Sequence, residues 1–304
     1  MAETTAGIRE QVPLAPFTSI RVGGTADALA ICTSFAGVTE ALAWAAGRDA
    51  PVAVVGKGSN LIVDDAGFRG LVIRLAGRLS SISVRGADTL WCGGGASLPR
   101  AVQRAAAAGL TGLEFGASIP GTAGGAVAMN AGAYASDLSQ VLDWAVVCDA
   151  SGPRKVGRDE LAMGYRTTSV TGDQVVAAVG FRLAPGDPAT IKQTLDGFRA
   201  HRRSTQPQGV RTFGSVFTNP PGESSGRLIE AAGLKGFVIG GARVSPVHAN
   251  FIEAAPGCSA ADVIAVMDEC RRTVRDAGGP VLQAEVRYLH PKWGIGSPPL
   301  QEIS

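Results

Sequence analysis

Small residues fill the segment Ile119-Pro-Gly-Thr-Ala-Gly-Gly-Ala126, and Asn130-Ala-Gly-Ala-Tyr134 follows it closely. Gly124 and Gly125 carry no side-chain bulk, so a flat ligand or another stretch of backbone can pack against them. Thr122 supplies a short polar side chain suited to a directed hydrogen bond. A tight contact between a helix and a sheet would use the same residues, so this segment alone leaves both interpretations open.

A second glycine-rich segment, Gly56-Lys-Gly-Ser-Asn60, directly follows the apolar run Pro51–Val55, which predicts a short buried strand. Glycines after a strand let main-chain N–H groups approach a phosphate closely. The Walker pattern fails because Gly58 follows Lys57, and the Rossmann pattern fails because Leu61 stands where a third glycine is needed. An ordinary glycine turn is the competing interpretation, but two such segments in one chain favour a large cofactor.

The composition predicts a well-packed protein of two or three domains. The chain has 304 residues, of which 45% are hydrophobic and 18% charged, and its formal net charge is +2. This charge gives no reason to expect nucleic acid or a membrane surface as a partner. Met1–Pro13 has no signal-peptide pattern and no apolar run is long enough to span a bilayer, so we expect a cytoplasmic protein. The five cysteines form no C-x-x-C pair, which favours free thiols and no metal site.

Helix and strand signals are mixed along the chain. Serine caps predict helices over 34–48, over 97–108 and from 259 to about 277, the last with Asp262 completing a capping box. A strand is expected over 282–289. The segment 112–134 has no clean period and is expected to be irregular, which is typical of functional segments. Proline and glycine punctuation sets four predicted domain ranges, which are 1–75, 76–185, 186–290 and a tail over 291–304.

Three polar residues in separate stretches are candidates for chemistry. Arg166 lies in Gly164-Tyr-Arg166, and a held guanidinium suits a carboxylate or an oxyanion because its fork matches two oxygens. Ser215 follows Gly214 but lacks a G-x-S-x-G elbow, which disfavours a nucleophilic serine and leaves a proton-donor role open. Glu285 would share a strand face with Gln283 and Arg287. Taken alone, Arg166 and Glu285 are more typical of ordinary surface charges.

Together these segments resemble the family of UDP-N-acetylenolpyruvoylglucosamine reductases, also called UDP-N-acetylmuramate dehydrogenases. The matching stretches follow the family's order and cover the chain from about residue 15 to 289. The resemblance implies an α+β fold in which two subdomains hold FAD in the vanillyl-alcohol-oxidase type of arrangement. A C-terminal α+β domain would complete the substrate site. The stretches include both glycine segments, Gly164-Tyr-Arg166, Gly214-Ser-Val-Phe-Thr-Asn-Pro220, 245–251 and Glu285.

The resemblance also implies a reaction in two halves, in peptidoglycan precursor synthesis. NADPH would reduce FAD, and a hydride would then pass to the vinyl carbon of the enolpyruvyl UDP-sugar. Ser215 would protonate the resulting carbanion, while Arg166 and Glu285 would stabilise its enol form. Tyr134 and Asn219 would contact the substrate, and we expect a monomer. The resemblance assigns cofactor binding to Gly56, Lys57, Gly58, Ser59, Asn60, Ile119, Pro120, Gly121, Thr122, Gly124, Gly125, Ala126, Asn130, Gly132 and Arg203.

The sequence departs from the family's pattern at three points. Thr218 stands where lysine is common, which should weaken diphosphate binding, and Ala135 stands where glycine is common. The third domain resembles the shorter class without an inserted, tyrosine-bearing substrate clamp. Two alternatives therefore stay open: a related FAD-dependent oxidoreductase acting on another small substrate, and a non-catalytic protein that binds flavin or nucleotide.

Overall fold

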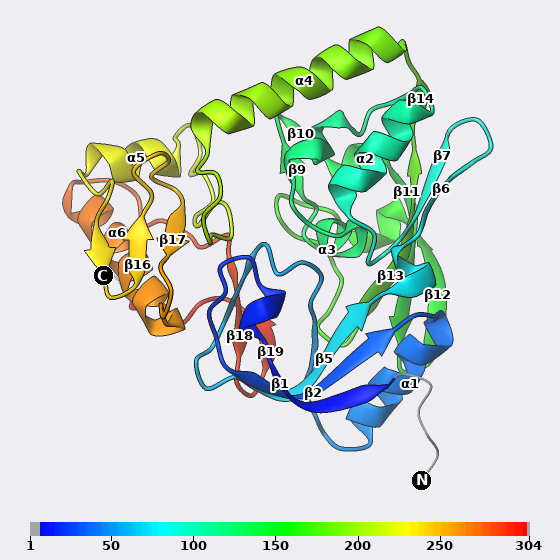
Figure 1. Cartoon of the computed structure of the whole chain (residues 1–304), viewed down its shortest axis with the longest axis horizontal. Coiled ribbons are helices and arrows are strands. Elements are labelled where there is room, and N and C mark those ends of the chain that lie inside the picture. Colours follow the sequence, from blue (N-terminus) through cyan, green and yellow to red (C-terminus); the bar gives the residue numbers. More distant parts are fainter. Residues whose placement is uncertain (1–6, 303–304) are drawn as a thin grey trace. The chain divides into compact units, whose positions relative to one another are not determined.

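The computed structural model describes residues 7–302, which form two compact units (Figure 1). The first unit contains residues 28–57 and 70–202 with the described residues up to Glu10, and the second contains 11–27, 58–69 and the chain from Arg203 onward. The predicted boundaries at 75, 185 and 290 do not coincide with this division, and the four-range organisation stays a prediction. Residues 1–6 and 303–304, at the outer ends of the predicted ranges, lie outside the described residues.

Two sheets have most of their residues in the first unit. One has the order β1 (Ile8–Pro13), β2 (Thr25–Cys32), β5 (Phe68–Leu75), β3 (Val52–Val54), with β3 and β5 parallel. The other is antiparallel, with the order β12 (Gly152–Gly157), β11 (Leu142–Asp149), β13 (Val175–Arg182), β7 (Thr89–Gly93), β6 (Ile82–Arg85). The short pairs are β8 (Leu110–Thr111) with β14 (Ala184–Pro185), and β9 (Gly132–Ala133) with β10 (Ser136–Asp137).

Helices cover both faces of the five-stranded sheet. Its central strand β13 is buried from Val175 to Phe181, because successive side chains point to opposite faces and each face meets a helix. Ala177 packs in the same cluster as α1 (Phe35–Ala46), whereas Val176 and Val179 pack with α2 (Leu98–Ala107) and α3 (Ala123–Ala128). The chain then continues in the long helix α4 (Pro188–Thr205) (Figure 1).

The structure confirms one expected helix start in this unit and corrects two expectations. Ser34 caps α1 by accepting the N–H of Gly37 at 3.1 Å. Ser97 precedes α2 but its side chain makes no cap bond. The segment 112–134, expected to be irregular, contains α3, which Thr122 caps. Periodicity does not reveal α3 because its glycines and alanines form no apolar stripe.

The second unit packs two helices against small sheets. One sheet has the antiparallel order β15 (Val238–Ile239), β16 (Ala242–Val244), β17 (Ile252–Ala254), and the other has the order β19 (Gly294–Gly296), β18 (Arg287–His290), β4 (Leu61–Val63). The helices are α5 (Ser225–Ala231) and α6 (Ala260–Asp276). The α6 side chains Val263, Val266 and Met267 are buried in one cluster with Val216 and Phe217.

One expectation in the second unit is also corrected. The predicted strand over 282–289 is regular only from Arg287; before it, the pairing is the isolated bridge between Ala284 and Phe217. The predicted tail over 291–304 contains β19, which forms a hairpin with β18 because the two strands pair from Tyr288 to His290. Within residues 7–302, no helix is long and apolar enough to cross a membrane.

Candidate functional site

The two glycine-rich segments meet within the first unit at Gly56 and Thr122. A Cβ at Gly56 would lie 2.5 Å from the Thr122 Oγ1, so only glycine allows this approach. Lys57 Nζ donates to the Ser97 Oγ at 2.9 Å, and Ser97 pairs with Thr122 in an isolated bridge. The sequence predicted both segments but not their contact.

Neighbouring glycines in the second segment serve different purposes. A Cβ at Gly124 would lie 2.4 Å from the Val176 carbonyl oxygen, so this glycine permits a tight helix–sheet contact. Gly125 is exposed, and apart from its chain neighbours and the backbone of its own helix, the Thr122 Oγ1 is the one described atom within 4 Å of its ideal Cβ, at 3.2 Å. Gly124 therefore serves packing, whereas Gly125 leaves its face uncovered, and a ligand contact there stays a prediction.

The loop from Gly56 to Asn60 fits a phosphate-bearing cofactor. Within residues 7–302, the main-chain N–H groups of Lys57, Gly58, Ser59 and Asn60 donate no hydrogen bond. The Gly58 carbonyl accepts from both the N–H and the Oγ of Ser19, at 3.1 and 3.3 Å, which fixes the loop. Free N–H groups suit a diphosphate, and the open Gly125 suits a flat ring, so the residues present fit FAD.

Arg74 is a basic residue beside this loop that the sequence reasoning missed. Its Nη2 donates to the Gly56 carbonyl at 3.1 Å from the end of β5. Burial lowers the pKa of its guanidinium. The sequence places this arginine directly after the apolar run Leu71–Ile73 and not far from a glycine-rich loop. No periodic pattern indicates that the arginine contacts the loop.

A hydrogen-bond network in the first unit connects Arg166 to the segment that follows α3. Arg166 Nη2 donates to the Gly132 carbonyl at 2.9 Å, and Asn130 Nδ2 donates to the Gly164 carbonyl at 2.8 Å. Asn130 is 2% exposed, and its Oδ1 accepts the N–H of Ser139 at 3.0 Å. Asn130 and Arg166 have φ of 38° and 57°, which non-glycine residues adopt at a cost and often at functional sites. Asn130 has a connecting role here, and its predicted cofactor contact stays a prediction.

Ser215 and Glu285 come together in the second unit on adjacent extended segments. The Glu285 N–H donates to the Val216 carbonyl at 2.8 Å, and Ser215 pairs with Phe251 on its other side. Val216 is buried, whereas Ser215 and Glu285 are half-buried. Two of the three predicted catalytic residues are therefore neighbours, while Arg166 belongs to the first unit.

Asn60 fixes the segment that carries Glu285. Its Nδ2 donates to the Glu285 carbonyl at 3.1 Å, and its own carbonyl accepts the Arg287 N–H at 3.1 Å. The last residue of the predicted cofactor loop is thus bonded to the segment of a predicted catalytic carboxylate. These residues are 225 positions apart, and nothing in the sequence indicates that they meet.

The remaining predicted site residues have simpler surroundings. Tyr134 stacks on Phe198 with ring centroids 3.9 Å apart, and its hydroxyl lies 3.1 Å from the Ser118 Oγ. Asn219 is exposed and its Oδ1 accepts the Ser225 N–H at 3.1 Å, so it helps to start α5. Thr218 donates its hydroxyl to the Gln283 carbonyl at 3.3 Å. Arg203 is exposed.

Two family models match this chain and define the class of protein to which it belongs. A family model described as FAD binding domain matches residues 26–155, which contain both glycine-rich segments. A second model, described as UDP-N-acetylenolpyruvoylglucosamine reductase, C-terminal domain, matches residues 206–289, which contain Ser215 and Glu285. The two matches confirm the predicted α+β fold class, an FAD-binding fold followed by a C-terminal α+β domain.

Individual relatives cover nearly the whole chain. UDP-N-acetylenolpyruvoylglucosamine reductase 2 of Symbiobacterium thermophilum is 43% identical over 94% of each chain. The reductase of Anaeromyxobacter dehalogenans is 44% identical over 91% of this chain and 84% of its own. The crystal structure of the reductase from Thermus caldophilus is 35% identical, with a TM-score of 0.81 over 92% of this chain and 99% of that chain. The protein belongs to the UDP-N-acetylenolpyruvoylglucosamine reductase family, as its motifs predict.

Proposed function

We propose that this protein catalyses the NADPH-dependent reduction of UDP-N-acetylglucosamine enolpyruvate to UDP-N-acetylmuramate, with FAD as bound cofactor, in peptidoglycan precursor synthesis. Relatives above 40% identity that match more than nine-tenths of the chain are named for this reductase. The observation that carries the proposal is that Ser215 and Glu285 lie on adjacent segments, joined by the bond from the Glu285 N–H to the Val216 carbonyl, in the domain that matches the family's C-terminal model. A cytoplasmic monomer is part of the proposal.

The cofactor would be held by the first glycine-rich loop and the open part of the second. The N–H groups of Lys57 and Gly58 would bind its diphosphate, and Gly125 would allow the ring to approach the main chain. When bound, FAD supplies a carrier that accepts two electrons from NADPH and delivers them as a hydride. Arg74 holds this loop through its hydrogen bond to the Gly56 carbonyl.

Ser215 is the proposed proton donor. Hydride addition to the terminal vinyl carbon moves the electron pair of the double bond toward the carboxylate-bearing carbon. The Ser215 hydroxyl then donates its proton to that carbon, and water restores the proton to the serine oxygen. A serine hydroxyl is a weak acid, but a carbanion is a strong base, so the transfer is favourable once both groups are held in reach.

Arg166 and Glu285 are proposed to stabilise the charge that develops before protonation. The Arg166 guanidinium matches the two oxygens of the substrate carboxylate. Its bond to the Gly132 carbonyl would restrict the side chain beforehand and so reduce the reorganisation needed during the reaction. The main chain of Glu285 is held by hydrogen bonds to Asn60 and Val216. Its carboxyl group would form a hydrogen bond with the enol oxygen of the substrate.

Steady-state NADPH oxidation tests the proposal. Purified protein should carry flavin absorbance and should oxidise NADPH when UDP-N-acetylglucosamine enolpyruvate is added. An NADPH oxidation rate equal to that without the sugar nucleotide would exclude this reductase activity. Flavin absorbance with that negative result would favour a related oxidoreductase with another substrate, and no flavin absorbance would exclude both.

Ser215→Ala tests the proton-donor role. We expect normal flavin reduction by NADPH but a loss of product formation of about 10²–10⁴-fold, the usual contribution of a positioned general acid. Ser151→Ala, a change of the same kind at an exposed loop residue, should leave both steps normal. Normal product formation by Ser215→Ala would show that another group supplies the proton.

A further inference from the structure

Asn250 uses its whole side chain to hold the Ser215 segment. Its Oδ1 accepts the Phe217 N–H at 2.9 Å, and its Nδ2 donates to the Phe217 carbonyl at 2.8 Å. Its main-chain carbonyl accepts the Val216 N–H at 3.0 Å. Asn250 is 4% exposed, so these groups have no water to replace a lost partner.

This arrangement replaces a regular strand pairing. The segment 213–219 has isolated bridges, at Ser215 with Phe251 and at Phe217 with Ala284, instead of a continuous ladder. The Asn250 amide supplies both bonds that a neighbouring strand would make to Phe217. Ser215 is two residues away on the same extended segment, so its position depends on this amide.

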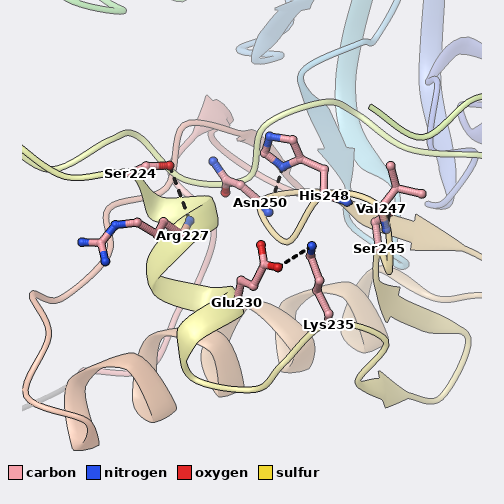
Figure 2. A network of polar contacts seen from close by, with 8 residues as sticks. All are labelled: Ser224, Arg227, Glu230, Lys235, Ser245, Val247, His248 and Asn250. Atoms are coloured by element: carbon pink, nitrogen blue, oxygen red, sulfur yellow. Dashed lines mark hydrogen bonds and ion pairs between the residues drawn. The ribbon is translucent and has the colours of Figure 1, made fainter. Parts of the chain in front are cut away.

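His248 in turn holds Asn250. Figure 2 shows the imidazole facing the main chain of Asn250, and its Nδ1 accepts the Asn250 N–H at 3.2 Å. A nitrogen that accepts carries no proton, so the ring in this contact is neutral, with its proton on Nε2. The ring packs against Phe251 with centroids 4.7 Å apart.

The surroundings fix the His248 ring in this orientation. A Cβ at Gly226 would lie 3.1 Å from the ring Cε1, so a larger residue at this position of α5 would press on the ring. Ser245 is fully buried, and its Oγ accepts the N–H groups of Val247 and His248 at 3.2 and 3.4 Å. The Lys235–Glu230 ion pair, at 2.7 Å, lies in the same network (Figure 2).

We infer that His248 and Asn250 are positioning residues for the Ser215 hydroxyl: neutral His248 orients Asn250, and the Asn250 amide sets the register of the Ser215 segment. Neither side chain needs to touch the substrate. The kinetic consequence of this inference rests on the proposed function. A displaced proton donor should slow the half-reaction with the sugar nucleotide, in which protonation of the carbanion draws hydride transfer to completion, and should leave flavin reduction by NADPH unchanged.

The test compares two replacements of His248 with one of Asn250 in the FAD-loaded enzyme. His248→Asn places an amide oxygen near the position of Nδ1 and keeps the acceptor, whereas His248→Leu keeps bulk and loses the acceptor. Reduction of the flavin by NADPH should be unchanged in all three variants. Reoxidation by UDP-N-acetylglucosamine enolpyruvate should slow about 10²-fold in Asn250→Ala and about 10-fold in His248→Leu, and should be near normal in His248→Asn.

Slower reoxidation in these variants could also arise from a general loss of stability, or the proposed function itself could be incorrect. Val266→Ala, in the same hydrophobic cluster but on α6, is the control for stability loss and should leave reoxidation unchanged. Amide hydrogen exchange over 213–219, measured without substrate, should rise in Asn250→Ala and His248→Leu and stay near the wild-type level in His248→Asn.

The two measurements distinguish the possible failures. Wild-type enzyme that is never reoxidised by the sugar nucleotide would overturn the proposed function, while hydrogen exchange would still test the positioning. Unchanged exchange and reoxidation in His248→Leu would overturn the positioning role of His248. If Asn250→Ala does not fold, the two His248 variants decide, because neither removes a bond to Phe217.

Discussion

Thr122 lies so close to Gly56 that no side chain fits at this position of the first glycine-rich loop. The structure assigns Gly56 to a contact with Thr122 and Gly124 to a contact with Val176, and leaves Gly125 open. Glycine in a sequence predicts that something approaches the main chain, but it does not say whether a ligand or the protein itself does.

Gly56→Ala should weaken the retention of FAD. The new Cβ would lie 2.5 Å from the Thr122 Oγ1, so the loop must shift away, at a cost of about 1–3 kcal/mol in unfolding free energy. Flavin content after purification and the thermal midpoint measure the two effects.

Gly197→Ala is the matched control for that change. Gly197 lies in α4, and apart from its chain neighbours and the backbone of its own helix no described atom lies within 4 Å of an ideal Cβ, so alanine should stabilise by about 0.5–1 kcal/mol without flavin loss. Full flavin content in Gly56→Ala would show that the loop tolerates the displacement and that its contact with Thr122 is not required.

His248 should make the stability of the protein depend on pH. Burial lowers the pKa of His248 below its ordinary value of about 6.5; a hydrogen bond of the ring to the main chain and the nearby Glu230 oppose this shift, and Lys235 adds to it. The unfolded chain then binds the proton at a higher pH than the folded one. The stability associated with neutral His248 is complete above the ordinary pKa and is lost as the pH falls through the folded pKa.

Chemical unfolding of wild type and His248→Asn at several pH values measures this effect. The wild type should lose more unfolding free energy than the variant between about pH 7.5 and 5. Identical pH profiles of the two proteins would contradict a lowered pKa for this residue.

At the scale of elements, helix starts could be predicted where the cap is local. Ser259 and Asp262 form the expected capping box at α6, with bonds of 3.0 and 3.1 Å. Asp65, far away in sequence, also accepts the N–H groups of Ala260 and Ala261, at 2.8 and 3.0 Å. Three-residue spacing is visible in a sequence, whereas a cap donated by a distant loop is not.

Ser259→Ala should destabilise the protein by about 0.5–2 kcal/mol, because the Asp262 N–H loses its acceptor. Ser259→Gly is the matched variant and should cost only about a few tenths of a kcal/mol, since water can reach the freed group. Denaturant unfolding measures both. Equal and negligible losses in the two variants would show that Asp65 caps the helix without help from Ser259.

The elements around Ser215 could be predicted less well. The segment 282–286 has an alternating pattern that predicts a strand, yet it is held by one isolated bridge and by the Asn60 and Val216 bonds. Strand propensity describes a residue on a pleated surface and cannot show that a side-chain amide from Asn250 replaces a strand. The sequence identified the candidate residues, but it did not predict the hydrogen bonds that hold their segments in place.

At the scale of the whole molecule, the chain order hides the division into units. Each unit combines separate ranges, and residues 58–69 belong with the chain from Arg203 onward. Proline and glycine residues in the sequence indicate where one domain could end and the next begin. Such boundaries divide the chain into successive ranges and cannot reveal a unit that is built from separate ranges. The family resemblance predicted the FAD-binding class and the C-terminal domain correctly, because it depends on motifs from the whole length.

The central claim is that reducing equivalents held by this protein pass to an enolpyruvyl ether. The most direct measurement mixes the NADPH-reduced enzyme, under anaerobic conditions, with UDP-N-acetylglucosamine enolpyruvate and follows flavin absorbance and products together. We predict reoxidation with formation of one UDP-N-acetylmuramate per flavin, and no reoxidation by UDP-N-acetylglucosamine, which lacks the vinyl ether. Flavin that remains reduced in the presence of the enolpyruvyl sugar would contradict the account.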